Sequence, residues 1–277
     1  GGIFTHVSGG RSHSCGVRTD GAISCWGDNS SGQSNAPSGA FTRVSAGRLH
    51  TCAVRTAGTL VCWGSNFFGE SNAPLGSFNQ LSSGEFHTCA LAADQSIVCW
   101  GSNASGQTNA PSGAFMEVAA GYNHSCGLKT DGSIVCWGAT FFNQLSAPGG
   151  TFTHIAAGAN HTCAVRPDAS LVCWGYNGFG QTVVPPGSYA QVTGGLGHTC
   201  GLKQDGSLKC WGRDITSQVT LLSEPLVQVS PGQSHTCALT PDSSVICWGL
   251  DIYGQSNPPA ATFTQLASGD YFTCGLR

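Results

Sequence analysis

The sequence predicts an all-β fold, a seven-bladed β-propeller built from 37-residue repeats with four short strands per blade. Two series of cysteines recur every 37 residues, and a tryptophan follows each cysteine of the second series. Seven of the nine histidines lie two residues before a cysteine of the first series. Residue types held in one register over the whole chain indicate one repeated structural unit. We therefore expect a single domain over residues 1–277, with seven full repeats and an extra 18-residue half repeat.

Each repeat divides into short runs that are separated by Gly, Pro, Asn and Asp and are too short for helices. In the second repeat the first strand is expected at 41–44, the second at 50–55 and the third at 60–63. A fourth strand is expected after Gly-Gln pairs such as 106–107. Glycine ends the loop between the second and third strands in four of seven copies, which favours a type I turn followed by a left-handed residue.

The register of this hairpin brings cysteines together. With Asp20 at the tip, Cys15 faces Cys25 and Val17 faces Ile23. Opposed Cβ atoms in a sheet lie about 4.5–5.5 Å apart, near disulfide reach. The spacing of ten residues does not fit zinc knuckles. The expected disulfides are Cys15–Cys25, Cys52–Cys62, Cys89–Cys99, Cys126–Cys136, Cys163–Cys173, Cys200–Cys210 and Cys237–Cys247, with Cys274 left unpaired or used in closure.

Both faces of the hairpin are apolar or small. The position of Gly16 is always Gly or Ala, and the third-strand residue on that face is usually Val. A sheet buried on both faces needs a neighbour on each side, and a ring of blades supplies it. We expect the small position to leave room for bulk from the neighbouring blade, namely the tryptophan.

The ring does not close evenly, because seven repeats occupy 259 of the 277 residues and leave 18. In one arrangement Cys15 pairs with Cys25 and the last segment, 260–277, is surplus. In the other, 260–277 completes the blade of Cys25 and 1–18 is surplus. A surplus strand-forming segment could add to a neighbouring chain. The alternative is that the chain is a trimmed piece of a longer one.

Composition excludes several classes of protein. Charged residues make up 9% of the chain and the net charge is -3, which argues against nucleic-acid binding. No apolar run is long enough to span a bilayer, so we expect no membrane insertion. Fifteen cysteines indicate an oxidising compartment, so the expected location is secreted or at the cell surface.

Candidate chemistry is sparse, and we expect no catalytic residues, no cofactor and no metal. The repeat histidines lie on separate blades, too far apart to share a zinc ion, and Phe272 replaces the last one. We expect instead one buried histidine per blade, bonded to a neighbouring loop. No acidic pair or phosphate-binding loop stands apart from the repeat.

Comparison of the copies predicts a binding face. The loops between first and second strands and between third and fourth strands vary, whereas the other two loops keep their sequence. In an up-and-down blade the two variable loops emerge at one end. Aromatic, charge-poor loops suit protein or sugar contacts, although the same residues could merely cap the blade edges. The candidate partner-binding residues are Phe67, Phe68, Phe86, Tyr122, Phe141, Phe142, Phe179, Tyr253 and Tyr271.

Glycosylation sequons lie in or beside these variable loops, and local turn chemistry is the alternative explanation for them. The sequon residues are Asn29, Asn103, Asn123 and Asn160.

Segments such as 46–54 (Ala-Gly-Arg-Leu-His-Thr-Cys-Ala-Val) and 62–66 (Cys-Trp-Gly-Ser-Asn) resemble regulator-of-chromosome-condensation repeats. The Trp-Gly-x-Asn-x-x-Gly-Gln stretch resembles the propeller-type secreted β-lactamase inhibitor, and the paired cysteines resemble Crinkly-type receptor ectodomains. The resemblance implies a seven-bladed propeller but transmits no single function.

The leading hypothesis is a non-enzymatic extracellular scaffold that presents its variable loops to a protein partner. The alternatives are a lectin-like, carbohydrate-binding adhesin and a structural or filament subunit joined by exchange of the surplus strands.

Overall fold

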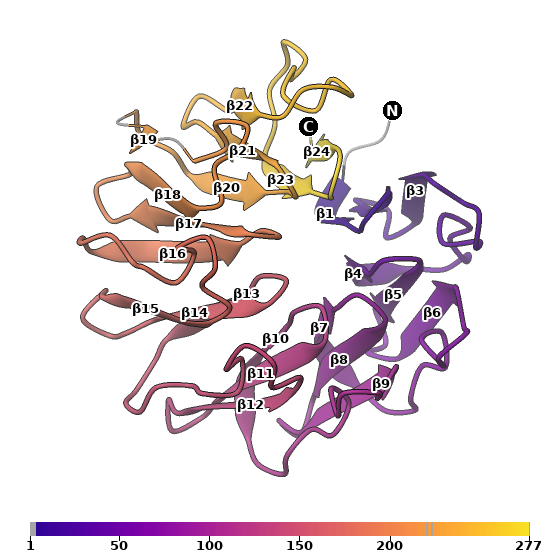
Figure 1. Ribbon diagram of the computed structural model, residues 1–277. Coiled ribbons are helices and arrows are strands. Elements are labelled where there is room, and N and C mark those ends of the chain that lie inside the picture. The colour runs from indigo at the N-terminus through magenta and orange to yellow at the C-terminus, as the bar shows by residue number, and fades with distance from the viewer. Residues whose placement is uncertain (1–3, 220, 223, 277) are drawn as a thin grey trace.

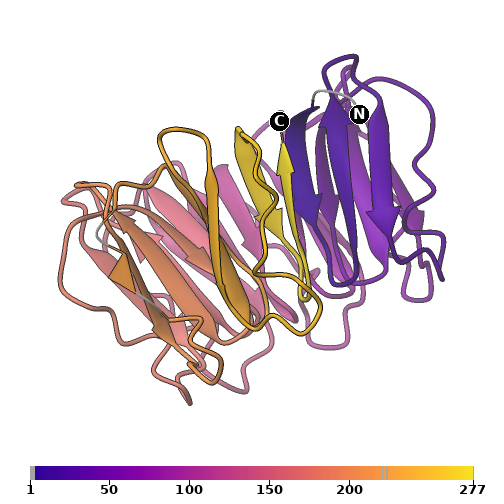
Figure 2. The same cartoon turned by 90° about the horizontal axis from the view of Figure 1, so that it is seen from above.

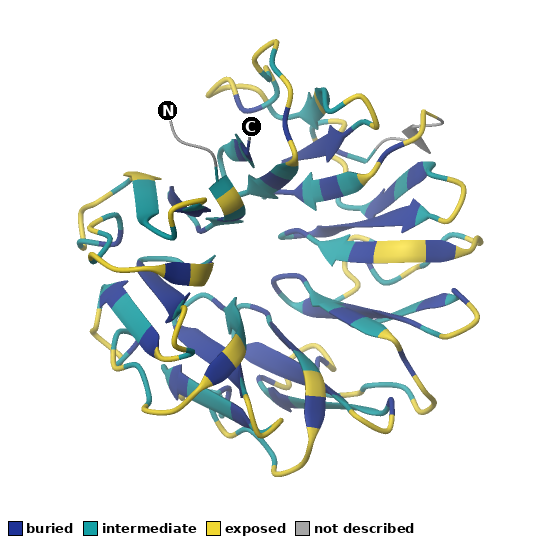
Figure 3. Cartoon of the chain, turned by 180° about the vertical axis from the view of Figure 1, so that it is seen from behind, coloured by how far each residue is buried: buried dark blue, intermediate teal, exposed yellow. Residues whose placement is uncertain are grey.

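A ring of radial β-sheets forms the protein in the computed structural model, which describes residues 4–219, 221, 222 and 224–276 (Figure 1). The described part contains 24 strands and no helix. Eight sheets follow one another round the ring in chain order: seven have three or four strands, and the last has two. The middle of each blade is buried and the loops at its ends are exposed (Figure 3).

The strands of each sheet are antiparallel. The first strand lies nearest the centre of the ring, and the second and third follow outwards (Figure 1). The first strands are β1 (Phe4–Gly9), β4 (Phe41–Ala46), β7 (Phe78–Ser83), β10 (Phe115–Ala120), β13 (His154–Ala157), β16 (Tyr189–Gly194), β20 (Gln228–Pro231) and β23 (Gln265–Ser268). The second strands are β2 (His13–Arg18), β5 (His50–Arg55), β8 (His87–Ala92), β11 (His124–Lys129), β14 (His161–Val165), β17 (His198–Lys203), β21 (His235–Leu239) and β24 (Thr273–Leu276). The third strands are β3 (Ile23–Gly27), β6 (Leu60–Gly64), β9 (Ile97–Gly101), β12 (Ile134–Gly138), β15 (Leu171–Gly175), β18 (Leu208–Gly212) and β22 (Val245–Gly249).

The expected fourth strand is reduced in this ring. Among the described residues it is a strand only as β19 (Leu221–Leu222), which pairs with β18. In the first repeat the residues after Gln33 instead close turns on themselves: the Asn35 amide donates to the Gly32 carbonyl, and the Ala36 amide donates to the Ser34 carbonyl. These turns use local acceptors, so the segment does not form a ladder with the third strand.

The hairpin register follows the prediction from the sequence. Cys15 lies opposite Cys25 and Val17 opposite Ile23, and the same pairing recurs in the six other full blades. All seven expected disulfides are present, with Cα atoms 4.0–4.1 Å apart. Cys274 is free and buried. The bridges therefore join the second and third strands of each full blade.

The small position of the second strand has a different neighbour from the one expected. At Gly16 a Cβ atom would meet the ring of Phe4, and at Gly127 it would meet the ring of Phe115. Both aromatic rings belong to the first strand of the same blade. The prediction of a neighbouring blade's tryptophan was therefore wrong, because the first-strand aromatic side chain already lies over this face of the second strand. At Gly127 a neighbouring blade does contribute bulk, since a Cβ there would also lie 2.9 Å from the Ile97 side chain.

The tryptophans instead join successive blades. Trp63 packs in a cluster with Cys15 and Val17 of the preceding blade and with Phe41 and Ala53 of its own. Tryptophan is therefore the main apolar contact across this interface, because a buried aromatic side chain removes about 150–250 Å² of surface from water.

The repeat histidines form a second link in the opposite direction. Each is fully buried, and its Nε2 lies 2.8–3.0 Å from a Thr or Ser hydroxyl of the next blade, as in His50 and Thr88. The expected buried histidine is present, but its partner is a strand residue rather than a loop. A Cβ at Gly47 would lie 2.3 Å from the His50 ring, so this position needs glycine.

The extra half repeat lies inside the ring. Cys15 pairs with Cys25, as in the first arrangement considered above, and the surplus segment forms the two-stranded sheet of β23 and β24. This sheet lies between β20 and β1 (Figure 2). The Asp270 amide donates to the Arg11 carbonyl, and the Arg11 amide donates to the Gly47 carbonyl. Equivalent bonds continue round the axis, so the inner loops form a closed circuit.

The residue that ends each hairpin turn has positive φ in all seven full blades, as the type I turn predicts. It is glycine in four copies, but Gln95, Ala169 and Ser243 adopt φ of 71°, 65° and 68°. A left-handed conformation costs a residue with a Cβ about 1–2 kcal/mol. These three turns therefore carry backbone strain that the glycine turns lack.

Replacing Gln95, whose side chain is exposed, by Gly should raise the free energy of unfolding by about 0.5–1 kcal/mol, since relief of this strain exceeds the entropy that glycine adds to the unfolded chain. Denaturant unfolding under non-reducing conditions measures the change. Gly206→Ala is the matched control and should lower stability, because its φ is 84° while a Cβ at this position would make only ordinary contacts, at 3.4 Å and beyond. Stabilisation by both changes would contradict this explanation.

Acid should destabilise the ring. Burial lowers the pKa of His50 to about 4 and that of His161 to about 3, and the five other repeat histidines are lowered to about 3 or 4. The unfolded chain therefore binds more protons than the folded one between the unfolded pKa of 6.5 and about 4. The stability is complete above pH 6.5 and falls as the pH falls through this window.

Denaturant midpoints at pH 7.5, 6 and 5 test this expectation, since each histidine contributes up to about 1.4 kcal/mol per pH unit. Two groups act in the opposite direction: Asp270, whose pKa burial raises to about 6, and His154, whose pKa the hydrogen bond with Glu117 raises. They stand against eight histidines, since burial also lowers the pKa of His6 to about 4. A midpoint that does not change from pH 7.5 to pH 5 would be incompatible with neutral buried imidazoles.

Candidate functional site

The two ends of the ring are formed by different loops of the repeat. At one end the Asp28 amide donates to the Ser12 carbonyl, so the loop after the third strand lies beside the loop after the first. At the other end the Phe41 amide donates to the Gly21 carbonyl. We call these ends the loop face and the turn face. The variable loops therefore emerge together on the loop face, as the alternation of strands predicts.

The turn face repeats one local structure. In five copies an aspartate accepts hydrogen bonds from the amide and hydroxyl of the serine two residues later, as Asp94 does from Ser96 at 3.0 and 2.7 Å. These bonds lower the pKa of Asp94 below its ordinary value. The aspartates are thus occupied in closing the turns, which explains why this end keeps its sequence.

The centre of the loop face is a cavity of about 260 Å³ around the axis. The ends of the first strands and the glycines that follow them line it in every blade, and seven variable inner-loop residues line it as well. Charged and phenolic side chains occupy one side of the circuit and small or apolar ones the other. In chain order these variable residues are Arg11, Arg48, Glu85, Tyr122, Ala159, Leu196 and Asp270.

The charges in this axial cavity form two pairs. Arg11 Nε lies 3.7 Å from Asp270 Oδ2, and the Arg48 guanidinium donates to the Glu85 carboxylate. Burial raises the pKa of Asp270 to about 6, against the lowering effect of Arg11. Burial also raises the pKa of Tyr122. The sequence showed that these positions vary but not that they converge on the axis.

Aromatic clusters lie further out on the loop face, where loops of successive blades meet. In the first, Phe68 lies edge-on to both Phe67 and Phe86, with centroids 4.8 and 5.4 Å apart. The Arg48 guanidinium lies 5.1 Å from the Phe86 ring centroid. Phe67 is 86% exposed and Phe68 46%, so the cluster presents apolar surface as well as covering the joint between blades.

A second cluster joins the outer loops of three successive blades. Tyr176 contacts Phe142 and Phe179 with centroids 4.7 and 5.7 Å apart, and Arg213 lies over Phe179 at 5.6 Å. Phe141 beside it is 81% exposed. The sequence analysis did not select Tyr176 or Arg213, although both begin a variable outer loop and could have been found by that position.

The remaining candidate residues lie apart from these clusters. Tyr253 and Tyr271 form a pair of their own, with centroids 5.8 Å apart. Tyr122 lines the axial cavity and contacts neither aromatic cluster through a ring contact in the described part of the chain. The nine candidates therefore share one face without forming one continuous patch.

The sequon residues on the outer loops take part in turn chemistry. Asn29 donates its amide to Asn35 and accepts from the Ser34 backbone amide. Asn66, which is not in a sequon, makes the same bonds with Asn72 and Ser71. Loop structure alone therefore accounts for the asparagine at these positions.

The described residues contain no group of three His, Cys, Asp or Glu side chains placed to hold a metal ion. Within the same residues no helix has the length and apolar character needed to cross a membrane.

The Asp270 carboxyl should titrate near pH 6, and its neighbours should shift that midpoint. Arg11→Gln should raise the pKa of Asp270 and Glu85→Gln should lower it, because the first removes a favourable charge and the second an unfavourable one. Carboxyl-carbon NMR titration measures both, and Asp94 on the turn face serves as the internal control. The same midpoint in all three proteins would mean that the axial charges are not coupled.

Comparison with known proteins agrees with this architecture. The match to the family described as Regulator of chromosome condensation (RCC1) repeat covers residues 4–33, 41–70, 78–107, 117–144, 152–181, 189–215 and 226–255. No curated protein matches the sequence.

Solved structures of three propellers resemble the chain. The ectodomain of the Physcomitrella patens receptor kinase CR4 is 28% identical, with a TM-score of 0.72 over 95% of this chain and 77% of that one. The Crinkly ectodomain of the Arabidopsis thaliana receptor kinase ACR4 is 24% identical, with a TM-score of 0.68 over 99% and 93%. Prp20p from Saccharomyces cerevisiae, studied for binding to Gsp1p and histones, is 19% identical, with a TM-score of 0.67 over 83% and 80%.

The fold follows from the repeat, and the family match spans seven copies of it. The chain belongs to the RCC1 repeat family and is a disulfide-rich β-propeller.

Proposed function

We propose that the protein is a non-enzymatic extracellular scaffold that binds a protein partner through its loop face. The observation that carries this proposal is the contrast between the two ends of the ring. The turn face repeats one hydrogen-bonded turn, whereas the side chains of the loop face vary from copy to copy. Individual residues on an otherwise uniform scaffold are typical of a surface that recognises something.

The chemistry of the loop face favours a protein partner. Its exposed side chains include aromatic rings, with arginines stacked on two of them, and these residue types are enriched at the centres of protein interfaces. The two clusters are held by loops of successive blades, so little side-chain freedom remains to be lost on binding. The resemblance to two receptor ectodomains supports an extracellular partner.

The disulfides support the extracellular location. Each bridge closes a loop of ten residues and contributes about 2–3 kcal/mol in the chain-entropy model. Disulfides of this number persist in oxidising compartments. They keep the blades folded where few ion pairs are present, and the loops therefore remain in fixed positions.

A binding screen against purified extracellular proteins and receptor ectodomains tests the proposal. Changing Phe67, Phe68, Phe141 and Phe142 together to Ala should weaken the affinity for any partner found at least about tenfold, since buried aromatic anchors dominate interface energies. Biolayer interferometry measures the affinity, and thermal unfolding checks that the variant is folded.

The matched control is Leu75→Ala, which removes a fully exposed apolar side chain on the turn face. It should leave binding unchanged. Equal loss with both variants, or unchanged binding with the loop variant, would show that the loop face is not the site. Binding to a glycan array with no protein partner would replace this proposal with the lectin alternative.

A further inference from the structure

The axial cavity of the loop face has the size of one side chain. Its volume is about 260 Å³, whereas an apolar cavity of about 150 Å³ already holds benzene. Pockets for larger organic ligands have volumes of about 300–1,000 Å³. All eight sheets contribute to the wall, so the cavity lies on the axis, at the centre of the face that we propose binds a protein. A guest of this size is a single amino-acid side chain or a small molecule.

The inner loops around the cavity have spare backbone acceptors. The amide of each variable residue donates to a carbonyl of the next blade, as Tyr122 does to Ala159. The amide of the glycine before it donates within its own blade, as Gly121 does to the His124 carbonyl. Five of the glycine carbonyls, in contrast, receive no hydrogen bond from the described residues, and these belong to Gly10, Gly84, Gly121, Gly158 and Gly269. The unused backbone capacity of these loops is therefore that of an acceptor, which suits a guest with N–H groups.

Asp270 is the least compensated charge in the cavity. Its partner is Arg11, whose Nε lies 3.7 Å from Oδ2, beyond hydrogen-bonding distance. No other described residue donates a hydrogen bond to this carboxylate. The Asp270 side chain is 20% exposed and that of Arg11 38%, so the arginine is the better solvated of the two. A carboxylate that is withdrawn from water without a donor is costly, and a cationic guest would supply both the donor and the charge.

The second arginine is occupied elsewhere. The Arg48 guanidinium donates to the Glu85 carboxylate and lies 5.1 Å from the ring centroid of Phe86, in the first aromatic cluster. Burial raises the pKa of Asp270 to about 6, and among the neighbouring charges Arg11 affects this pKa most and Arg48 least. Arg48 is thus held by Glu85 and the aromatic cluster, and it does little to compensate Asp270.

Tyr122 stands opposite Asp270 in the circuit of eight inner loops, four positions away, and both residues line the cavity. Burial raises the pKa of Tyr122. Asp270 and Glu85 raise it further, and the two arginines lower it by less. The phenol therefore lies in a net negative field, and its hydroxyl is free of hydrogen bonds to the described residues. Ala159 and Leu196 form an uncharged side of the same wall.

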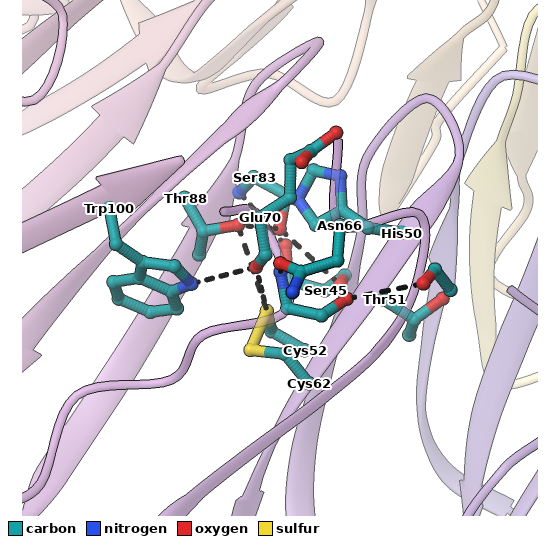
Figure 4. Close-up of a disulfide and its surroundings, with 12 residues drawn as sticks. Ser45, His50, Thr51, Cys52, Cys62, Asn66, Glu70, Ser83, Thr88 and Trp100 are labelled. Atoms are coloured by element: carbon teal, nitrogen blue, oxygen red, sulfur yellow. Dashed lines mark hydrogen bonds between the residues drawn. A yellow bond between two sulfur atoms is a disulfide. The ribbon is translucent and has the colours of Figure 1, made fainter. Parts of the chain in front are cut away.

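Buried hydrogen bonds hold the wall in place before any guest enters. Ser83 lines the cavity, and its hydroxyl lies 3.1 Å from that of Thr88, which in turn lies 2.9 Å from His50 Nε2 (Figure 4). Gly47, another residue of the wall, rests on the same histidine, since a Cβ there would lie 2.3 Å from the ring. A wall supported in this way needs little ordering on binding.

We propose that the axial cavity binds one organic cation, the ammonium or guanidinium group of a lysine or arginine side chain of the protein partner. The cation lies between the Asp270 carboxylate and the Tyr122 hydroxyl, and its aliphatic stem contacts Ala159 and Leu196. A metal ion suits the site less well, because the described residues contain no group of three metal-binding side chains. This inference rests on the proposed function, since it assigns the partner one side chain at the centre of the loop face.

Small probes test the cavity without the partner. Nα-acetyllysine N-methylamide and Nα-acetylarginine N-methylamide are titrated at pH 7.5, and carboxyl-carbon NMR follows Asp270. Saturable binding of either probe is expected, and it should lower the pKa of Asp270, because a nearby cation favours the ionised carboxylate.

Two control probes show whether charge is recognised. Nα-acetylnorleucine N-methylamide keeps the stem without the charge, and Nα-acetylglutamate N-methylamide carries the opposite charge. Both should bind at least about tenfold more weakly than the better cationic probe, as expected for a charge-assisted contact. Norleucine binding as tight as the cation, or tighter binding of glutamate, would overturn the proposal, and so would the absence of binding by both cationic probes.

Variants of the cavity locate the site. Asp270→Asn should weaken binding of the cationic probe at least about tenfold, followed through the Tyr122 ring signals. Tyr122→Phe removes one hydrogen bond and should weaken it about two- to tenfold, followed through Asp270. Asp94→Asn makes the same chemical change on the turn face and should leave binding unchanged, and thermal unfolding checks that each variant is folded. Equal effects at Asp270 and Asp94 would exclude the axial site.

The partner-binding assay separates this inference from the proposed function. Asp270→Asn should weaken the affinity for a loop-face partner at least about tenfold. If the loop phenylalanine variant loses the partner while Asp270→Asn binds it normally, the loop face is still the binding site and this inference is wrong. If the cationic probes bind but no protein requires the loop face, the proposed function fails, and the assignment of the cation to a partner's side chain fails with it.

Discussion

The ring depends on two opposed hydrogen bonds at each interface between successive full blades. The tryptophan of one blade donates to a backbone carbonyl of the blade before it, as Trp137 does to Gln107. The histidine of the same blade bonds a hydroxyl of the blade after it, as His124 does with Thr162. Both are buried, so each polar atom would be costly without its partner. A blade is thus held from both sides. Because every full blade needs these two bonds, the tryptophan and the histidine keep their positions in the repeat while the loops vary freely.

Much of this architecture follows from residue spacing. The cysteine intervals and the turn length fix the register of each hairpin, because opposed side chains must share one face of a sheet, and all seven disulfides follow from it. The hairpin turn was also predictable, including its left-handed residue at Gly21. The neighbour of Gly16 was not, since spacing along one strand does not say which other strand lies over it. The reduction of the fourth strand was not predictable from spacing either, because it depends on backbone groups after Gln33 that find acceptors in their own turn.

The candidate site was predictable as a face but not as a set of contacts. Alternation of strand direction places the variable loops at one end whatever their sequence. Convergence of Arg11, Glu85 and Asp270 on the axis depends on the curvature of the whole ring, which no single repeat encodes. Pairing of Phe68 with Phe86 joins loops of different blades, so neither residue alone predicts it. The rings cover the joint between blades, as the alternative of edge capping expects, and Phe67 remains exposed.

The directionality of the blade contacts has a consequence for assembly. Because one side of each unit differs from the other, the association is heterologous, the same head-to-tail arrangement that generates rings or open filaments among separate subunits. The repeats behave as a covalently tethered oligomer in which curvature, rather than any terminating residue, sets the number of members. Gene duplication could therefore lengthen or shorten the circle one module at a time.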